Sequence, residues 1–418
     1  MDVIVRKSEV EGEAEVPPSK SYTHRALIAA SLSPSSRISN PLISADTLAT
    51  LSGCRKIGAE FVRKNSTWFV RGVDRITSSG YFNFENSGTT LRIFAGILSL
   101  STSPVFSVLD GDSSLRKRPN RELALALKKL GAEVYGDGEF RAPISVRGVL
   151  KGGEVEMEAA SSQFVSSLLF SLPMARWDST LRVIRVKSQP YINITLDVLR
   201  SSGIKIEREE SEYHISGDQK FKLREYTIPA DFSSASYLIA AGLLAGKVRL
   251  KNVFDSEQGD KRIIDVCREM GGDIKWDREK GTVIARKSEL EGIEVDAADI
   301  PDLVPTISVL AATARGETRI YNAEHLRIKE IDRIDGIVKN LKALNVEAEA
   351  KADGITVKGR EGEFRGIVNS FGDHRMALAF SLLGLLGEVR CLKAEVVSVS
   401  FPGFFDTLKS LGADIIKL

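Results

Sequence analysis

One pattern occurs six times along this chain: an amphipathic helix ends at a glycine or asparagine, and a charged residue then leads into a predicted strand. The stop positions are Gly58, Gly131, Gly203, Gly271, Asn345 and Gly412, and they lie 67 to 74 residues apart. Glycine and asparagine are typical of the left-handed position that ends a helix. This period is too long for an ordinary solenoid unit, so we expect six copies of a larger α/β unit.

A second series of helices lies between these stops. Each copy contains a strongly apolar helix with a polar start, near Ser21, Ser87, Ser162, Ser233, Asp302 and Asp373. Helices that are apolar all round are buried. The segment 181–186 alternates as a half-buried strand does, and 120–130 predicts an amphipathic helix capped by Asn120. Buried helices therefore direct six polar N-termini at whatever this protein binds.

The copies divide into two groups of three. A chain of 418 residues is too long for one ordinary core. Prolines at 17, 18 and 229 predict two crossings between domains. We expect a first domain over 20–228 and a second over 1–19 and 229–418.

Composition excludes several classes of protein. The net charge is +2, from 58 basic and 56 acidic side chains, so charge alone does not indicate nucleic acid or membrane binding. Cys54, Cys267 and Cys391 are too few for a disulfide framework, and four histidines without a Cys-x-x-Cys pair argue against zinc. The first residues lack the features of a signal peptide, so we expect a cytoplasmic protein.

The first candidate site opens the helix that begins near Ser21. Lys20 and Arg25 lie in its first turns, where their charge opposes the helix macrodipole. An anion bound there would satisfy both cations and the free N–H groups. A capped helix with solvated charges is the alternative. Arg92, His374 and Arg375 repeat the feature at two further buried helices, which favours a shared anion site.

Two loops add charge. Four cations lie within residues 116–121, where a solvated loop is the alternative. Residues 327–333 mix both signs, where surface pairing is the alternative, with Glu330 and Arg333 placed to pair at i,i+3. Asp302 and Glu330 are the acid–base candidates. Asp302 lies in an apolar setting that would raise its pKa, although it is equally placed to be a helix N-cap.

Eight motifs in order resemble one family. They are Lys20-Ser21-x-x-x-Arg25, Asn86 to Arg92, Gly111 to Pro119, Ser161-Ser162-Gln163, Ser188 to Tyr191, Pro301-Asp302, Lys329 to Arg333 and Gly372 to Ala377. Together they resemble the 5-enolpyruvylshikimate-3-phosphate (EPSP) synthase family of the enolpyruvyl transferases, over essentially the whole chain.

This resemblance implies a fold and a reaction. The fold is two inside-out α/β domains, each of three βαβαββ units, joined by a two-strand hinge, with the N-terminal strand on the second domain. The reaction transfers the enolpyruvyl group of phosphoenolpyruvate to the 5-hydroxyl of shikimate 3-phosphate and releases phosphate. The resemblance implies no metal or cofactor, a monomer, and domains that close on shikimate 3-phosphate.

The resemblance also assigns site residues. Asp302 is the expected base, and Glu330 with Lys20 the expected proton donor and acceptor. The expected shikimate 3-phosphate ligands are Lys20, Ser21, Arg25, Ser161, Ser162, Gln163, Ser188, Tyr191, Asp302, His325 and Lys329. The expected phosphoenolpyruvate ligands are Lys20, Gly88, Arg118, Gln163, Arg333 and Arg375.

Two departures and two rivals remain. Val399 stands where many members have a phosphoenolpyruvate-binding lysine, and His325 where many have an asparagine. Enzymes that use UDP-N-acetylglucosamine typically carry a cysteine in the loop that is Gly111–Pro119 here, and this loop has none. A non-catalytic RNA- or anion-binding protein on a related fold is disfavoured by the near-zero net charge and by Asp302.

Overall fold

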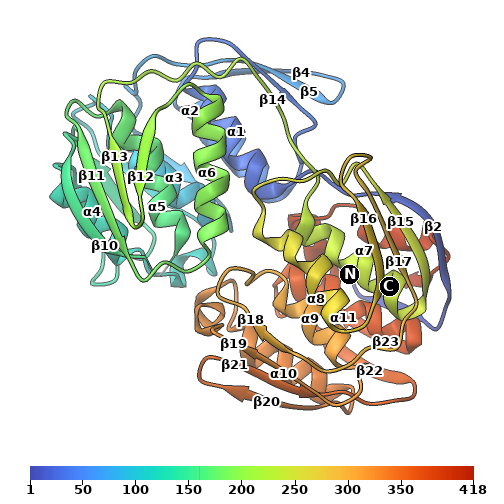
Figure 1. The fold of residues 1–418 in the computed structure, drawn as a ribbon. Coiled ribbons are helices and arrows are strands. Elements are labelled where there is room, and N and C mark those ends of the chain that lie inside the picture. Colours follow the sequence, from blue (N-terminus) through green and yellow to red (C-terminus); the bar gives the residue numbers. More distant parts are fainter. Residues whose placement is uncertain (160) are drawn as a thin grey trace. The chain divides into compact units, whose positions relative to one another are not determined.

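The computed structural model describes residues 1–159 and 161–418, and its contacts divide the chain into two compact units. The continuous unit spans Pro18–Ile228. The split unit combines Met1–Pro17 with Pro229–Leu418. The first boundary lies two residues before the one expected from the sequence, and the second coincides with it. Each unit has its own hydrophobic core, and each is described separately below (Figure 1).

The described residues form six four-stranded sheets, three in each unit, with the same order of pairing. The first two strands of each sheet are parallel. The second strand is antiparallel to its other neighbour, which is antiparallel in turn to the edge strand. A parallel pair requires a crossover, and the buried helices supply it in four of the six copies. The sixfold unit is therefore βαβαββ, as the resemblance to the family implies.

The continuous unit contains three copies of this unit. The first has α1 (Lys20–Ser31), β3 (Ser36–Ser39), α2 (Ala45–Lys56), β4 (Glu60–Lys64), β5 (Thr67–Arg71) and β14 (Glu225–Thr227). The second has β6 (Gly80–Asn83), α3 (Gly88–Leu98), β7 (Ser107–Asp110), η1 (Leu115–Lys117), α4 (Arg121–Lys129), β8 (Glu133–Tyr135) and β9 (Ile144–Arg147). The third has β10 (Gly153–Glu158), α5 (Ser162–Ser171), η2 (Leu172–Met174), β11 (Ser179–Ile184), α6 (Gln189–Ser201), β12 (Ile206–Glu209) and β13 (Glu212–Ile215).

The split unit contains the other three copies. The fourth has β2 (Val10–Glu15), α7 (Phe232–Ala245), β15 (Gly246–Lys251), η3 (Gly259–Arg262), α8 (Ile263–Glu269), β16 (Asp273–Asp277) and β17 (Thr282–Arg286). The fifth has β18 (Glu294–Asp296), α9 (Val304–Ala311), β19 (Glu317–Tyr321), η4 (Glu324–Ile328), α10 (Arg333–Ala343), β20 (Glu347–Lys351) and β21 (Gly354–Lys358). The sixth has β1 (Val3–Arg6), β22 (Phe364–Asn369), α11 (His374–Phe380), η5 (Ser381–Leu386), β23 (Gly387–Leu392), η6 (Ala394–Val399), α12 (Phe404–Ser410) and β24 (Asp414–Lys417).

Two strands are exchanged between the copies at the unit boundaries. In sequence β2 precedes α1, yet it pairs with β15 of the split unit. Likewise β14 precedes α7, yet it pairs with β3 of the continuous unit. The first strand, β1, lies between β23 and β24. The strands β1, β2 and β14 therefore each complete a sheet whose other strands are distant in sequence.

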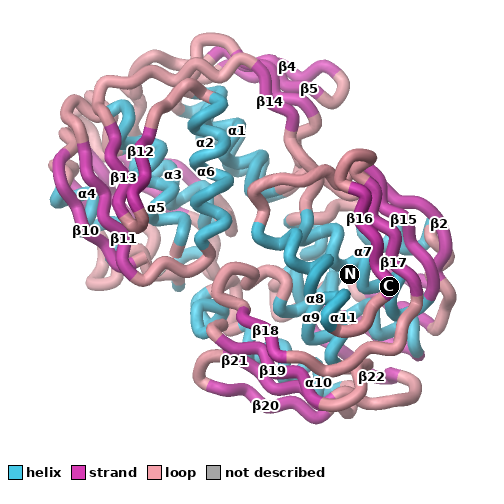
Figure 2. Tube along the Cα trace, in the orientation of Figure 1, coloured by secondary structure: helices cyan, strands magenta, loops and turns pink. Residues whose placement is uncertain are grey.

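Within each unit the helices lie inside and the sheets outside (Figure 2). Every residue of α7 is buried, and ten of the eleven residues of α3 are. This confirms the prediction from their apolar composition. The predicted helix stops are also confirmed, because Gly58, Gly131, Gly203, Gly271, Asn345 and Gly412 all have positive φ.

Candidate active site

The start of α1 in the continuous unit holds two cations in different environments. The Lys20 ammonium lies 3.0 Å from Asp46 Oδ2, an acidic residue in the first turn of α2. Arg25 is 1% exposed, and its guanidinium donates to the Thr195 hydroxyl at 2.7 Å, the Ser166 hydroxyl at 3.2 Å, and the backbone carbonyls of Ser21 and Tyr191. Both ends of the expected Lys20-Ser21-x-x-x-Arg25 motif therefore face polar groups.

The partners of Arg25 are neutral oxygens. Burial lowers its pKa to about 10, with Tyr191 and Tyr22 opposing that shift. A buried cation without a carboxylate is costly. An anionic ligand oxygen at this position would remove that cost. Burial of Arg25 thus favours an anion-binding site over a helix start whose charges are solvated.

The start of α3 forms a second cluster. Arg118 donates to the Asn86 side chain at 2.6 Å, to the Asn86 carbonyl and to Ser114, while its buried Nε has no partner. A Cβ added at Gly88 would lie 3.1 Å from Arg118 Nη1. Gly88 therefore leaves room for a ligand between the first N–H groups of α3 and this guanidinium.

Gln163 connects α5 to the same cluster. Its amide nitrogen donates to Thr89 Oγ1 at 2.8 Å, and its amide oxygen accepts from Arg92 at 2.6 Å. The N-cap of α5 is Ser161, whose hydroxyl accepts from the Gln163 backbone, and Ser162 is buried. These bonds bring the predicted residues of α3 and α5 together.

Asn120 is the N-cap residue of α4, as the sequence predicts, but its side chain makes no cap hydrogen bond. Its oxygen accepts from Arg92 Nε at 2.9 Å, and its nitrogen donates to the carbonyls of Arg118 and Phe140. The position is therefore confirmed, whereas the side chain is used by a buried guanidinium that needs an acceptor.

Ser188 and Tyr191 begin α6. Ser188 is the N-cap in a left-handed conformation with φ 60, and it makes no side-chain cap bond. The backbone carbonyl of Tyr191 accepts from Arg25 Nη2 at 3.2 Å. The start of α6 is thus tied to the start of α1 through Arg25.

In the split unit, Arg333 lies at the centre of a charge cluster. It is 1% exposed, and each of its three nitrogens faces a carboxylate: Nε to Asp373 at 2.7 Å, Nη1 to Asp302 at 2.8 Å and Nη2 to Glu330 at 2.7 Å. Burial opposes the charge of Arg333, but Asp373, Glu330 and Asp302 outweigh it and raise its pKa. The i,i+3 pair of Glu330 and Arg333 is confirmed, here as a partly buried bond.

Asp302 joins Arg333 and Arg375, the two expected phosphoenolpyruvate arginines of the split unit. Its second oxygen accepts from Arg375 Nη2 at 2.6 Å, and Arg375 also donates to the Tyr237 hydroxyl. The N-cap of α9 is Leu303, so Asp302 is not the cap. The sequence describes the setting as apolar, whereas the carboxylate faces two guanidiniums.

Two further carboxyl groups of this unit were missed. Asp373 caps α11 and pairs with Arg333, and burial raises its pKa although Arg333 opposes the shift. Asp260 in η3 is buried and accepts from the Ser233 hydroxyl, while its other oxygen has no partner. Burial and the charge of Asp302 raise the pKa of Asp260 to about 7. The Asp373-His374-Arg375 opening offered a signal for Asp373, and no spacing pointed to Asp260.

The two remaining candidates lie in or beside η4. His325 is buried within it, and Lys329 follows it and is half-buried. Val399 ends η6. Lys329 and Glu330 precede the Asp332 N-cap of α10, so this short connection carries three charged side chains toward the start of one helix.

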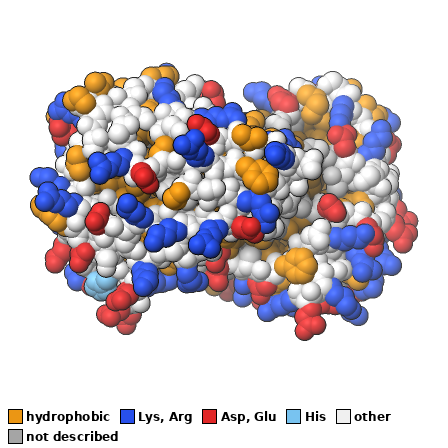
Figure 3. Space-filling model, turned by 90° about the horizontal axis from the view of Figure 1, so that it is seen from above, with side chains coloured by type: hydrophobic (Ala, Val, Ile, Leu, Met, Phe, Trp, Pro, Cys, Tyr) orange, Lys and Arg blue, Asp and Glu red, His pale blue; other side chains and the backbone are white. Residues whose placement is uncertain are grey.

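The described residues show no site for a metal ion and no membrane-spanning helix. Among them, no group of three His, Cys, Asp or Glu side chains is placed to hold a metal ion. No described helix is long and apolar enough to cross a membrane. Basic and acidic side chains are interspersed on the face in Figure 3, in line with the small net charge.

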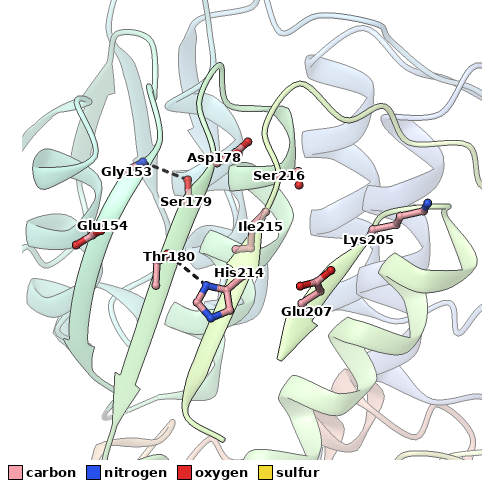
Figure 4. A pocket seen from close by; sticks show the side chains of 10 residues that line it. All are labelled: Gly153, Glu154, Asp178, Ser179, Thr180, Lys205, Glu207, His214, Ile215 and Ser216. Atoms are coloured by element: carbon pink, nitrogen blue, oxygen red, sulfur yellow. Dashed lines mark hydrogen bonds between the residues drawn. The ribbon is translucent and has the colours of Figure 1, made fainter. Parts of the chain in front are cut away.

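A hollow of about 570 Å³ lies over strands β10, β11, β12 and β13. Its walls carry both signs of charge, from Glu154, Lys205 and Glu207, together with His214 near Thr180 (Figure 4). It contains none of the predicted site residues, and we assign it no role.

Comparison with known proteins identifies the family of this chain. The EPSP synthase (3-phosphoshikimate 1-carboxyvinyltransferase) family model matches residues 4–408. A 3-phosphoshikimate 1-carboxyvinyltransferase from Archaeoglobus fulgidus is 68% identical over the full length of both chains. One from Methanocaldococcus jannaschii is 44% identical over 99% of each.

Solved structures agree. The EPSP synthase from Acinetobacter baumannii superposes with a TM-score of 0.84 at 26% identity, covering all of both chains. The enolpyruvyl transferase NikO from Streptomyces tendae superposes with a TM-score of 0.79 over 99% of this chain and 98% of its own, and at 17% identity it shows the fold alone. The chain thus has the fold of the enolpyruvyl transferases. It belongs to the EPSP synthase (3-phosphoshikimate 1-carboxyvinyltransferase) family.

Proposed function

We propose that this chain transfers the enolpyruvyl group of phosphoenolpyruvate to the 5-hydroxyl of shikimate 3-phosphate and releases phosphate. The full-length relative that is 68% identical carries the name of this activity. The observation that carries the proposal is the buried cluster in which Arg333 and Arg375 hold Asp302 and Glu330 at the starts of helices. It supplies carboxylates for proton transfer beside cations for anionic substrates.

Each unit contributes its own ligands. We assign shikimate 3-phosphate mainly to the continuous unit, and the acid–base carboxylates with part of the phosphoenolpyruvate site to the split unit. The proposed shikimate 3-phosphate ligands are Lys20, Ser21, Arg25, Ser161, Ser162, Gln163, Ser188, Tyr191, Asp302, His325 and Lys329. The proposed phosphoenolpyruvate ligands are Lys20, Gly88, Arg118, Gln163, Arg333 and Arg375.

The environments of the arginines support this division of roles. Arg25 is buried among neutral oxygens, and Arg118 has a buried Nε without a partner. Both are suited to a dianionic phosphate, which accepts several charge-assisted hydrogen bonds at once. Arg333 is already neutralised by carboxylates. It therefore orients Asp302 and Glu330, and its proposed contact with phosphoenolpyruvate requires the substrate to take the place of one of these carboxylates.

The reaction then proceeds in two stages. Glu330, with Lys20, donates a proton to the methylene carbon of phosphoenolpyruvate, which leaves a cationic carbon. The 5-hydroxyl oxygen attacks that carbon while Asp302 takes the hydroxyl proton, giving a tetrahedral ketal. In the second stage the bond from that carbon to the phosphate oxygen breaks, phosphate leaves, and Glu330 recovers a proton from the methyl group. The proton accepted by Asp302 returns to solvent or to phosphate.

We also propose that the enzyme works as a cytoplasmic monomer. The three cysteines are free and buried, and burial raises the pKa of each thiol, of Cys54 and Cys391 to about 12. Protonated, buried thiols are inert and need no oxidising compartment.

Phosphate release measured in the presence of EDTA tests the proposal. It should require both phosphoenolpyruvate and shikimate 3-phosphate, and omission of either should abolish it. UDP-N-acetylglucosamine in place of shikimate 3-phosphate is the matched control, since it is the acceptor of the rival enzymes. Phosphate release with phosphoenolpyruvate and that sugar nucleotide, but not with shikimate 3-phosphate, would contradict the acceptor assignment. Loss of activity in EDTA that a divalent ion restores would contradict a metal-free reaction.

A further inference from the structure

A chain of buried side chains joins three helices of the continuous unit. His24 Nδ1 of α1 lies 2.6 Å from the Thr50 hydroxyl of α2. Thr50 lies 2.6 Å from the Thr90 hydroxyl of α3, and Thr90 lies 2.6 Å from the Ser87 hydroxyl. None of the four residues is more than 1% exposed. This chain runs from the helix that carries Lys20 and Arg25 to the N-cap of α3.

The direction of the hydrogen bonds follows from the imidazole. Burial, with the charges of Lys20 and Arg25, holds the pKa of His24 well below its usual range, so the ring is neutral. Its Nε2 is buried and has no partner. A buried N–H without an acceptor is rarer and costlier than a bare lone pair. The proton therefore lies on Nδ1, and His24 donates to Thr50.

One direction then holds for the whole chain. Thr50 accepts from His24, and Thr90 is the other partner of the Thr50 hydroxyl among the described residues. Each hydroxyl has a single hydrogen, so the Thr50 hydrogen goes to Thr90 and the Thr90 hydrogen goes to Ser87. The Ser87 oxygen also accepts from the Thr90 backbone N–H as the cap of α3. This oxygen is held from two sides, which fixes the first turn of α3. That turn begins at Gly88, beside Arg118.

We propose that His24 is a positioning residue for the anion site at the start of α3, acting through Thr50 and Thr90 on the Ser87 cap. This inference rests on the proposed function, because that site is assigned there to phosphoenolpyruvate. His24 itself touches no substrate. It holds the N–H groups of the first turn of α3 in the place where they and Arg118 bind the same anion.

Two substitutions at Thr50 separate this role from simple packing. Thr50→Val keeps the volume and removes the hydroxyl, whereas Thr50→Ser keeps the hydroxyl and removes a methyl group. Loss of a buried hydrogen bond costs about 1–1.5 kcal/mol, or roughly tenfold in binding. Thr50→Val should therefore raise KM for phosphoenolpyruvate by about five- to tenfold, with KM for shikimate 3-phosphate changed less than about twofold. Thr50→Ser should leave both nearly unchanged. Equal shifts in the two KM values, or a larger effect from Thr50→Ser, would overturn the proposal.

Substitutions at His24 test the donor. The nitrogen of an asparagine side chain can take the place of Nδ1, whereas that of glutamine reaches toward Nε2. His24→Asn should therefore keep KM for phosphoenolpyruvate close to the natural value, and His24→Gln should raise it as Thr50→Val does. Equal behaviour of the two variants would contradict a role for Nδ1–H.

A substrate-free measurement keeps the two proposals distinguishable. The ¹⁵N shifts of the imidazole of His24 in the whole protein should report a neutral ring protonated at Nδ1, with the His24→Asn variant used to assign the signals. A ring protonated at Nε2, or charged at pH 7, would overturn the proposed direction of the hydrogen bonds from His24 to Ser87, whatever the substrate of the enzyme. Arg118→Met tests the site itself: an unchanged KM for phosphoenolpyruvate there would refute the assignment of the anion and leave the tautomer result standing.

Discussion

At the scale of single residues, two buried arginines differ in the groups that compensate their charge. Arg333 is surrounded by three carboxylates, whereas Arg25 is surrounded by neutral oxygens. Only removal of all three carboxylates from the first would leave its buried charge unpaired, a loss that typically costs about 3–5 kcal/mol. Adding an anion to the second is favourable for the same reason. In the proposed mechanism, the first arrangement orients Asp302 and Glu330, and the second binds the phosphate of a substrate.

Asp302→Asn and Glu330→Gln should each lower turnover by about 10²–10⁴, the usual range for lost acid–base catalysis. Glu330→Gln should change shikimate 3-phosphate binding much less, because Arg333 keeps two carboxylates in that variant. Initial rates and calorimetric titration measure the two effects. Glu324→Gln, an exposed neighbour in η4, is the matched control and should retain full turnover. Normal turnover in either test variant would remove that residue from the mechanism.

Asp260 should make stability depend on pH. Its pKa is raised to about 7, first by burial and then by Asp302, while an aspartate of the unfolded chain titrates near 3.9. The raised pKa stabilises the fold fully below about pH 4, and that contribution is lost as pH rises toward about 7, at up to about 1.4 kcal/mol per pH unit. Asp260→Asn cannot ionise. It should therefore gain stability over the natural protein between pH 4.5 and pH 8, by a few kcal/mol at most.

Urea unfolding at both pH values measures this difference. Asp255→Asn is the control: burial opposes the charge of Asp255, but Lys261 and the Ser256 N–H outweigh it and lower the pKa below its ordinary value. The contribution of that carboxylate is lost only below about pH 4, so the difference between this variant and the natural protein should be nearly the same at both pH values. A difference between Asp260→Asn and the natural protein that is the same at both pH values would show that Asp260 is ionised throughout.

Local and distant contacts of these residues differ in how far the sequence predicts them. The Glu330–Arg333 pair is visible at i,i+3 because both lie at one helix start. The bonds of Arg333 to Asp302 and Asp373 join residues 31 and 40 positions apart. Those pairs depend on how three helices pack, which no spacing in the sequence records. The sequence motifs identified these residues, but they did not predict that Arg333 and Arg375 form ion pairs with carboxylates.

At the scale of elements, the helix stops are the best-determined feature. Each of the six ends at a residue with positive φ, a conformation that costs an ordinary residue about 1–2 kcal/mol. Glycine avoids that cost, so the chemistry of one residue places the end of an element. The side-chain contacts at the helix starts are less well predicted. The Asn120 side chain, for example, accepts from Arg92 instead of capping α4.

Gly203→Ala should therefore destabilise the protein by about 1–2 kcal/mol. Gly203 has φ +76, and a Cβ there would meet Lys222 only at 3.8 Å, so the loss reflects the backbone rather than a clash. Denaturant unfolding measures it. Ser201→Ala, at the exposed last residue of α6, should be neutral or slightly stabilising, and an equal loss in both variants would contradict the backbone explanation.

At the scale of the whole molecule, the two units differ in continuity. The core of the continuous unit draws on residues between Tyr22 and Ile228. The core of the split unit includes Val3, Val5 and Val10. The repeat predicts six α/β units from sequence alone. It does not predict that β1 pairs with strands almost 400 residues later, because a four-residue apolar segment fits any sheet. That placement was expected only from the resemblance to a known family.

A fragment of residues 18–228 should fold alone and unfold in one cooperative transition, as judged by circular dichroism and urea titration. A fragment of residues 229–418 should not, because β1 and β2 complete two of its sheets. Asp2 and Leu418 are hydrogen-bonded backbone to backbone, so an Asn-Gly turn can join Leu418 to a relocated segment 1–17 as a hairpin. This permuted fragment should fold. Folding of 229–418 without residues 1–17 would contradict the prediction.

The position of β1 also orders events during synthesis. Ribosomes add about 5–20 residues per second, and domains complete early in the chain fold first. The strand Val3–Arg6 is made before the continuous unit, yet its partners, Gly387–Leu392 and Asp414–Lys417, are made after it. It must wait unpaired for roughly 20–80 s at those rates, while the continuous unit has all its residues once Ile228 is made. During synthesis β1 therefore stays unpaired until the other strands of its sheet have been made. A chaperone that holds unfolded chains is expected to bind this unpaired strand.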